Sequence, residues 1–379
     1  MRTTIILALG AAAAAGALIW AGLAGTAAAG PPSAVSPAGL AQLVTAYVGS
    51  GSGTVTPIRA ATNTALKAIR VGRLPVAIAI TPDGQTAYVV NETSGTVTPI
   101  RTATNTAGKP IKVGASPSAI AITPDGQTAY VVNGATGGDT VTPIRTATNT
   151  AGKPIKVGNG AEAIAITPDG RTAYVVSVAG TVTPIRTATN TAGKPIKVGN
   201  TPVFIAITPD GATAYVVNEG SGTVTPIRTA TNTAGKAIKV GGGGPIAITP
   251  DGQTAYVANI TGHTVIPIRT ATNTAGKAIS AGGTGGAASE WIANTPNGAT
   301  VYLASLGSRT VTPIRTATNT AGQPIKIGGA GPIAITPNGA TAYVANPTGR
   351  TVTPIRTATN AAGLPITVGN GAFAIAITP

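Results

Sequence analysis

The chain has 379 residues, of which 43% are hydrophobic and only 9% charged, so disorder driven by excess charge is excluded. Its formal net charge is +15, and its 51 Gly and 30 Pro predict little helix because both residues interrupt helices. The absence of Cys excludes disulfides, a thiol nucleophile, a thiolate metal site and a lipid-modified cysteine.

The N-terminus is typical of an export signal. Met1 and Arg2 give a short positive end, an apolar run follows, and "TAAAG" offers a small-residue cleavage site near Ala29. We therefore expect a signal peptide over residues 1–29 and a Pro-rich spacer over 30–41. The apolar run is also long enough to span a bilayer, so an uncleaved anchor is the alternative. No second apolar segment approaches membrane length, which predicts an extracytoplasmic body without other membrane contact.

Internal repetition organises residues 42–379. The segment "TVTPIR" begins at Thr54, Thr96, Thr140, Thr181, Thr223, Thr310 and Thr351, with "TVIPIR" at Thr264. Successive spacings are 42, 44, 41, 42, 41, 46 and 41 residues. A period of about 40 residues indicates one supersecondary unit per repeat.

Each repeat contains four short runs bounded by turn residues, as in "AIAITP", "TAYVVN", "TVTPIR" and "KPIKVG". Their length and β-branched content predict strands, and the Pro-Asp-Gly step predicts a hairpin turn. The run with Pro and Lys suits an exposed edge strand. We expect the Pro inside "TVTPIR" to lie where the short fourth strand no longer pairs with it.

Four antiparallel strands every 40-odd residues predict an all-β fold of the β-propeller type. The units, with "YVVN" at 88–91 and 130–133 and "YVAN" at 256–259 and 343–346, resemble the YVTN-type β-propeller repeat of secreted and surface-layer proteins. The resemblance covers residues 42–379 and implies interaction rather than a defined reaction. The chain departs from it by placing Arg where that family commonly has an acidic residue after the Ile of the third strand.

The strand count predicts eight four-stranded blades, with seven as the alternative. The chain ends on "AFAIAITP", a first strand without a second, and opens at residue 42 on a second strand without a first. We therefore expect the C-terminal strand to join the N-terminal blade and close the ring, which removes the free sheet edges.

Loops between first and second strands should share one face with loops between third and fourth strands. Eight arginines end the third strands: Arg59, Arg101, Arg145, Arg186, Arg228, Arg269, Arg315 and Arg356. Lys67, Lys109, Lys153, Lys194, Lys236 and Lys277 follow in what we expect to be loops of that face, against Asp83, Asp125, Asp169, Asp210 and Asp251 of the turns. Such a face could attract an anionic polymer. Alternatively, each Arg pairs with a turn Asp or a carbonyl, and the remaining charge serves solubility.

The eight Tyr all fall in second strands, which predicts packing between blades rather than a binding ladder. The turn Asp residues could be imagined as metal ligands. Asn297 and Asn338 replace them in two later repeats, however, and turn geometry explains either residue without metal.

The other face is where the repeat departs from itself. The repeat with the spacing of 46 carries the Gly-rich insertion "SAGGTGGAASEWIANTP", which includes Glu290 and Trp291. His263, the only His, should share that face, and Glu162, Phe204 and Phe373 fall at the start of first strands near the channel mouth. Together these residues could form a recognition patch, with Trp291 stacking a sugar. The alternative is a blade junction that needs a large residue to fill space.

Catalysis is not expected, because only Glu162, Glu290 and His263 could converge as ligands, which is too few for a metal-dependent lactonase or lyase. We expect no cofactor and no metal. The expected function is a monomeric, secreted or cell-surface binding scaffold for an extracellular protein or cell-wall glycan. The alternative is an anionic polymer, such as nucleic acid, bound through the Arg/Lys face.

Overall fold

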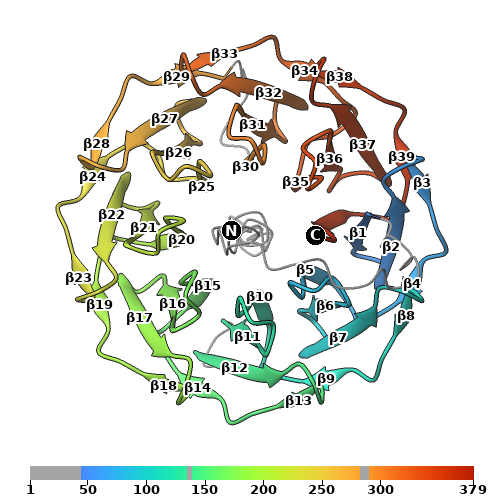
Figure 1. Ribbon diagram of the computed structural model, residues 1–379, viewed down its shortest axis with the longest axis horizontal. Helices are drawn as coiled ribbons and strands as arrows, with labels where there is room; N and C mark the ends of the chain where they lie inside the picture. The colour runs from blue at the N-terminus through green and yellow to red at the C-terminus, as the bar shows by residue number, and fades with distance from the viewer. Residues whose placement is uncertain (1–43, 135–138, 282–289) are drawn as a thin grey trace, which may run out of the picture.

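The computed structural model describes residues 44–134, 139–281 and 290–379, and these form eight antiparallel sheets in a ring (Figure 1). The fold is an eight-bladed β-propeller, as the repeat count predicts, and the seven-blade alternative is excluded. The expected signal peptide and spacer lie outside the described residues. Nothing in the described part of the chain is a helix long and apolar enough to cross a membrane.

The innermost strand of each blade lies nearest the centre of the ring (Figure 1). It is half-buried or buried over most of its length, and two copies are reduced to three residues. These strands, from blade 2 round to blade 1, are β5 (Pro75–Ile80), β10 (Pro117–Ile122), β15 (Ala161–Ile166), β20 (Pro202–Ile207), β25 (Ile246–Ile248), β30 (Glu290–Asn294), β35 (Ile333–Ile335) and β40 (Ala372–Ile377).

The second strand carries a buried Tyr followed by Val, or by Leu in blade 7, and is almost wholly inaccessible to solvent. From blade 1 to blade 8 these strands are β1 (Thr45–Ser50), β6 (Thr86–Asn91), β11 (Thr128–Asn133), β16 (Thr172–Ser177), β21 (Thr213–Asn218), β26 (Thr254–Asn259), β31 (Thr300–Ser305) and β36 (Thr341–Ala345). The third strands, which end on the exposed arginine, are β2 (Thr54–Arg59), β7 (Thr96–Arg101), β12 (Thr140–Arg145), β17 (Thr181–Arg186), β22 (Thr223–Arg228), β27 (Thr264–Arg269), β32 (Thr310–Arg315) and β37 (Thr351–Arg356).

The outermost strand is split into two short pieces that both pair with the third strand. The first pieces are β3 (Thr64–Ala65), β8 (Thr106–Ala107), β13 (Thr150–Ala151), β18 (Thr191–Ala192), β23 (Thr233–Ala234), β28 (Thr274–Ala275), β33 (Thr320–Ala321) and β38 (Ala361–Ala362). The second pieces are β4 (Ile69–Arg70), β9 (Ile111–Lys112), β14 (Ile155–Lys156), β19 (Ile196–Lys197), β24 (Ile238–Lys239), β29 (Ile279–Ser280), β34 (Ile325–Lys326) and β39 (Ile366–Thr367).

The split explains how a Pro is tolerated inside a third strand. In blade 2, β8 pairs with Ile100 and Arg101 and β9 pairs with Thr96 and Val97, so Pro99 lies opposite the gap between them. Its carbonyl accepts a hydrogen bond from the Gly108 N–H at 2.7 Å. No outer strand presents a carbonyl to the Pro nitrogen, so its missing N–H leaves no partner unpaired. The expected position of this Pro is confirmed.

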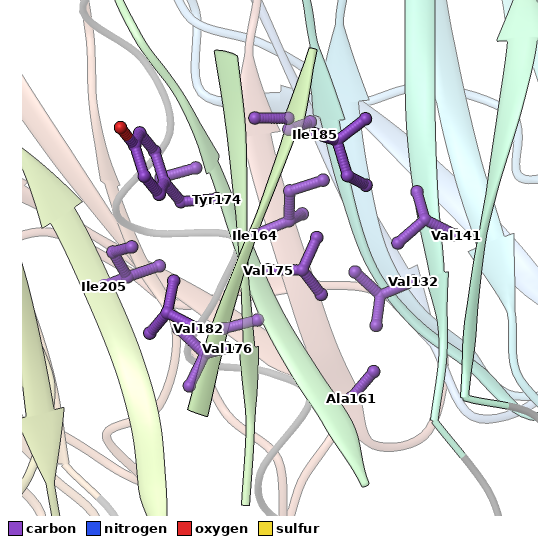
Figure 2. Close-up of a cluster of buried hydrophobic side chains, with 14 of the residues drawn as sticks. Val132, Val141, Ala161, Ile164, Tyr174, Val175, Val176, Val182, Ile185 and Ile205 are labelled. Carbon is purple, nitrogen blue, oxygen red and sulfur yellow. The ribbon is translucent and has the colours of Figure 1, made fainter. Parts of the chain in front are cut away.

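The hydrophobic core lies between blades. In the largest cluster, Val132 and Val141 of blade 3 pack with Ile164 and Tyr174 of blade 4, and Ile205 of blade 5 joins them (Figure 2). All of these side chains are buried. Because the sheets are covered on both faces, successive positions along a strand are apolar, which accounts for the lack of strict alternation in the sequence.

The chain ends meet in blade 1. Strand β40 pairs with β1, with Tyr47 opposite Ala376 and Val48 opposite Ile375. Beyond the ladder, the Thr45 N–H donates to Thr378 Oγ1 and the Thr378 N–H donates to the Thr45 carbonyl, both at 3.0 Å. The predicted closure of the ring by the C-terminal strand is therefore confirmed.

Candidate binding surfaces

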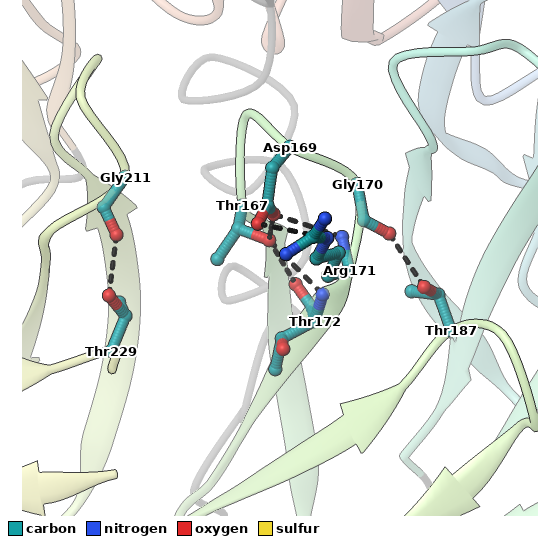
Figure 3. Close-up of polar contacts among 8 residues, drawn as sticks. All are labelled: Thr167, Asp169, Gly170, Arg171, Thr172, Thr187, Gly211 and Thr229. Carbon is teal, nitrogen blue, oxygen red and sulfur yellow. Dashed lines mark hydrogen bonds and ion pairs between the residues drawn. The ribbon is translucent and has the colours of Figure 1, made fainter. Parts of the chain in front are cut away.

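In the turn between first and second strands, the aspartate side chain accepts hydrogen bonds from other groups of the same turn. In blade 4, Thr167 Oγ1 donates to Asp169 Oδ1 at 2.6 Å, and the Arg171 N–H donates to the same oxygen at 3.0 Å (Figure 3). The same pair of bonds recurs at Asp83, Asp125, Asp210 and Asp251. At Asp210 the hydrogen bond from Thr208 lowers the pKa of the carboxyl below its ordinary value. Asn297 and Asn338 make the same bonds, so the turn does not require a metal.

The eight arginines that end the third strands form the arginine ring. Seven of them are exposed and Arg59 is half-buried. Within the described residues the single ion pair joins Arg171 to Asp169 at 3.8 Å, and Arg171 is not a member of the ring. The turn aspartates thus do not neutralise the arginine ring. Its charges are available to an anion, which is the condition that the polyanion interpretation requires.

The two loops of the arginine face are joined by a hydrogen bond within each of blades 2 to 8. In blade 4, Thr187 Oγ1, next to ring member Arg186, donates to the Gly170 carbonyl at 2.6 Å, and Thr229 does the same to Gly211 in blade 5 (Figure 3). These bonds tie the loop after the third strand to the turn after the first strand. The expectation that these two loops share a face is therefore correct, and each ring arginine leaves from a fixed backbone position.

The structure corrects the expected position of the lysines. Lys109 follows β8 and precedes β9, so it lies in the break of the outermost strand rather than in a loop of the arginine face. Lys67, Lys153, Lys194, Lys236 and Lys277 occupy the same break and, like Lys109, are exposed. The sequence predicts the fourth strand as the single run "KPIKVG". In the structure the "TA" residues already pair with the third strand, so the fourth strand begins before the lysine. The lysine therefore lies on the outer wall of the propeller.

Each Tyr of a second strand links its blade to the next blade. Tyr130 in blade 3 is fully buried, and its hydroxyl donates to Asn190 Oδ1 in blade 4 at 2.6 Å. Burial raises the pKa of this phenol to about 12. Eight such pairs encircle the ring: Tyr47–Asn105, Tyr88–Asn149, Tyr130–Asn190, Tyr174–Asn232, Tyr215–Asn273, Tyr256–Asn319, Tyr302–Asn360 and Tyr343–Asn63. The predicted packing role of the Tyr residues is therefore confirmed.

Sequence reasoning missed the asparagine partners. Each lies in the "TATN" or "AATN" stretch after the third strand, and Asn190 has a φ of 53°. Asn adopts this left-handed region more readily than most residues. Its recurrence at one fixed position of all eight repeats was a signal that could have identified it.

The residues predicted at the channel mouth are dispersed over several blades. Trp291 is 4% exposed and packs with the side chains of blade 8, among them Ala330 and Ile333, while Glu290 lies on the opposite side of β30 by strand alternation. Trp291 thus fills the junction between blades 7 and 8, where the first strand of blade 8 is short. The preceding part of the Gly-rich insertion, residues 282–289, lies outside the described residues.

The remaining candidates occupy separate positions. Glu162 is half-buried at the bulged second residue of β15, and its pKa is raised by burial and by Glu92 and Glu219 nearby. Phe204 packs against the core cluster of blades 5 and 6, and Phe373 lies against Gly51 and Gly371 of the ring closure.

His263 is half-buried in the turn between β26 and β27, with a φ of 50°. Within the described ranges no three His, Asp or Glu side chains could hold a metal ion together. His263 Nδ1, Glu290 Oε2 and Trp291 Nε1 are buried without a hydrogen-bond partner among the described residues, so local packing does not satisfy all of their polar atoms, and the recognition patch stays a prediction.

Comparison with solved structures gives propeller-like matches. The hydrazine synthase of Kuenenia stuttgartiensis matches with a TM-score of 0.63 and 24% identity, over 75% of this chain and 96% of that chain. The dihydro-heme d1 dehydrogenase NirN in complex with DHE matches with a TM-score of 0.73 and 14% identity, over 87% and 74%. A functionally unknown protein from Desulfotomaculum acetoxidans DSM 771 matches with a TM-score of 0.64 and 21% identity, over 88% and 98%.

Identities below a quarter show likeness of fold alone. No protein-family model matches the chain, and no curated protein sequence matches it.

Proposed function

We propose that this chain is a secreted or cell-surface β-propeller that acts as a non-catalytic binding module, and that its ligand is an anionic polymer bound through the arginine ring. A YVTN-type repeat is our interpretation of the unit from which the module is built. The export signal expected over residues 1–29 supports a location outside the cytoplasm.

One observation carries the proposal. The only acidic residues on the arginine face belong to the turns between first and second strands, and each of those carboxylates is held by a threonine hydroxyl and a backbone N–H. The arginines therefore keep their charge unpaired at eight regularly repeated positions. A ring of like charges on a rigid frame costs free energy through self-repulsion, and a bound polyanion would relieve it.

A protein or glycan bound at the channel mouth has less support. The side chain best suited to stack on a sugar, Trp291, is buried between two blades. A ligand could reach it only after the blade junction opened.

The test is polymer binding at several salt concentrations. The protein should bind a labelled polyanion with an affinity that falls steeply between ~50 and ~200 mM salt, because each neutralised charge releases a counterion. Replacing Arg101, Arg145, Arg186 and Arg228 with Ser should weaken binding by roughly tenfold or more.

A matched control removes the same charge elsewhere. Replacing Arg73, Arg309, Lys326 and Arg350, which are exposed and lie outside the arginine face, should have a much smaller effect. Equal losses in the two variants would mean that only net charge matters, and binding that ignores salt would refute the proposal.

A further inference from the structure

The outer wall of the propeller carries columns of cations. In blade 2, Arg101 ends the third strand, Lys109 lies in the break of the outermost strand and Lys112 ends its second piece. All three side chains are exposed. Because the third strand is six residues long, these cations are distributed over a wall roughly 20 Å high.

The columns are complete on five consecutive blades and incomplete on the other three. Blades 1 to 5 carry Arg59, Lys67 and Arg70; Arg101, Lys109 and Lys112; Arg145, Lys153 and Lys156; Arg186, Lys194 and Lys197; and Arg228, Lys236 and Lys239. In blades 6 to 8, Ser280, Gln323, Leu364 and Thr367 replace a cation. Blade 8 keeps only Arg356, and its Leu364 is 88% exposed at the position of Lys109.

The wall has no acidic residue. In every repeat, the segment from the arginine to the start of the next first strand contains neither Asp nor Glu. The columns also adjoin one another: the second outer piece of one blade, such as β9, lies within 8 Å between Cα atoms of the first outer piece of the next blade, such as β13. The cations of blades 1 to 5 therefore form a continuous band, which we call the cationic track.

We infer that the cationic track binds a flexible linear polymer of phosphate groups along the outer wall of blades 1 to 5, away from the central channel. The inference rests on the proposed function and locates the ligand of that function. A linear polyanion can neutralise columns that follow one another around the wall, and it must stop where the track ends at blades 6 to 8.

The chemistry of the wall favours phosphate without bases. The segments that form the track contain no Phe, Tyr or Trp in any repeat. Single strands of nucleic acid are usually held by stacking their bases on aromatic side chains. The track offers only Arg and Lys, which bind phosphate oxygens, so the bases would add little.

The chain supplies its own neutral substitutes for the test. Blade 7 has Gln323 where blades 1 to 6 have Lys, and its outermost strand forms in the same way. A track variant with Lys109, Lys153, Lys194 and Lys236 replaced by Gln keeps the arginine ring intact and should fold. The Arg73, Arg309, Lys326 and Arg350 variant again removes equal charge outside the track.

Binding of long-chain inorganic polyphosphate, followed by fluorescence anisotropy against salt, distinguishes the outcomes. We expect the track variant to bind roughly tenfold or more weaker and to have a log–log salt slope smaller by about 3, because about 0.7–0.9 of a counterion is released per contact. The control should lose less than about threefold. A loss that is equal in both variants overturns the track.

Further binding measurements distinguish the proposed function from the cationic track, and a phosphate polymer from other polyanions. If the parent binds neither polyphosphate nor heparin nor oligo(dT), the proposed function fails. If the parent binds and the ring variant weakens while the track variant does not, only the track fails. Tripolyphosphate that binds as tightly as the long chain would refute an extended site. Oligo(dT) or heparin that binds far more tightly than polyphosphate of equal charge would refute a base-free phosphate polymer.

Discussion

At the scale of single residues, the protein joins its blades through one repeated pair, the buried Tyr of a second strand and the Asn of the next blade. The hydrogen bond is short because the phenol is enclosed and the Asn backbone is fixed in a left-handed turn. Asn is suited to both requirements, since it tolerates positive φ and presents an acceptor. The pairs contribute to rigidity in addition to the apolar packing between blades.

Removing one hydroxyl should measure this contribution. We expect Tyr130→Phe to lower the free energy of unfolding by about 0.5–1.5 kcal/mol, because the Asn190 oxygen loses its donor in a part-buried hydrogen bond. Asn190→Gly keeps the positive φ while removing the acceptor. The double variant should then lose less than the sum of the single losses in urea denaturation. Strict additivity would mean that the pair is not coupled.

A second residue-scale prediction concerns Glu290. Its side chain is 4% exposed, one carboxyl oxygen has no partner among the described residues, and burial raises its pKa from 4.5 to about 7. Between pH 4.5 and pH 7 this carboxyl is ionised in the unfolded chain but still protonated in the folded protein. The free energy of unfolding therefore falls as pH rises from about 4.5 to 7, and it stays lower above pH 7. Glu290→Gln should therefore stabilise the protein at pH 8 by up to about 3 kcal/mol and change little at pH 4.

The matched control for this prediction is Glu219→Gln, at an exposed carboxylate. Chemical denaturation of both variants at pH 4 and pH 8 provides the measurement. A pH-independent effect of Glu290→Gln, or an equal effect of Glu219→Gln, would show that burial of the Glu290 charge is not the cause.

At the scale of elements, the sequence predicted the first three strands of each repeat because β-branched runs are bounded by Gly, Asp and Asn turns. It did not predict the split of the outermost strand. Two-residue pieces such as Thr106–Ala107 leave no periodic pattern, and "TATNTA" reads as a loop. The split depends on pairing with a distant part of the repeat, which local propensity does not encode. The lysines were misplaced for the same reason.

The binding surfaces were predicted unevenly. The arginine ring followed from the repeat period, since a residue at a fixed point of every strand must recur around the ring. The patch around Trp291 stays a prediction, because deviation from a repeat does not distinguish a ligand site from a gap between blades. The structure shows Trp291 buried beside the shortened first strand of blade 8.

The turn between first and second strands yields an element-scale prediction. Asp251 accepts from Thr249 at 2.6 Å and from the Gln253 N–H at 3.0 Å, and Asn338 accepts equivalent bonds in blade 8. Asp251→Asn should therefore change the free energy of unfolding by less than about 0.5 kcal/mol, whereas Asp251→Ala should cost about 1 kcal/mol. Urea denaturation compares them. If Asp251→Asn lowers the free energy of unfolding as much as Asp251→Ala does, the carboxylate has a role beyond the turn.

At the scale of the whole molecule, the ring makes every blade a neighbour of two others, so no blade is terminal. Closure places the two ends of the described chain in one sheet, where β40 is the innermost strand of a blade whose other strands come from residues 45–70. A linear array of such blades would expose two large apolar sheet faces. In the ring, blade 1 is packed against blade 8 on one side and against blade 2 on the other, which buries these faces.

Deleting residues 372–379 should therefore destabilise the whole ring rather than fray one tip. Ile375 and Ile377 are 3% and 5% exposed, and losing two buried Ile side chains with their ladder would cost at least about 5 kcal/mol, a large part of the stability of a typical domain. Blade 1 would also offer the open edge of β1 to other chains. We expect a strongly lowered Tm and association of the deleted protein, measured by calorimetry and light scattering. Removal of Pro379 alone, which is exposed, should leave both unchanged. A deletion that retained the parent Tm would show that the ring holds without its last strand.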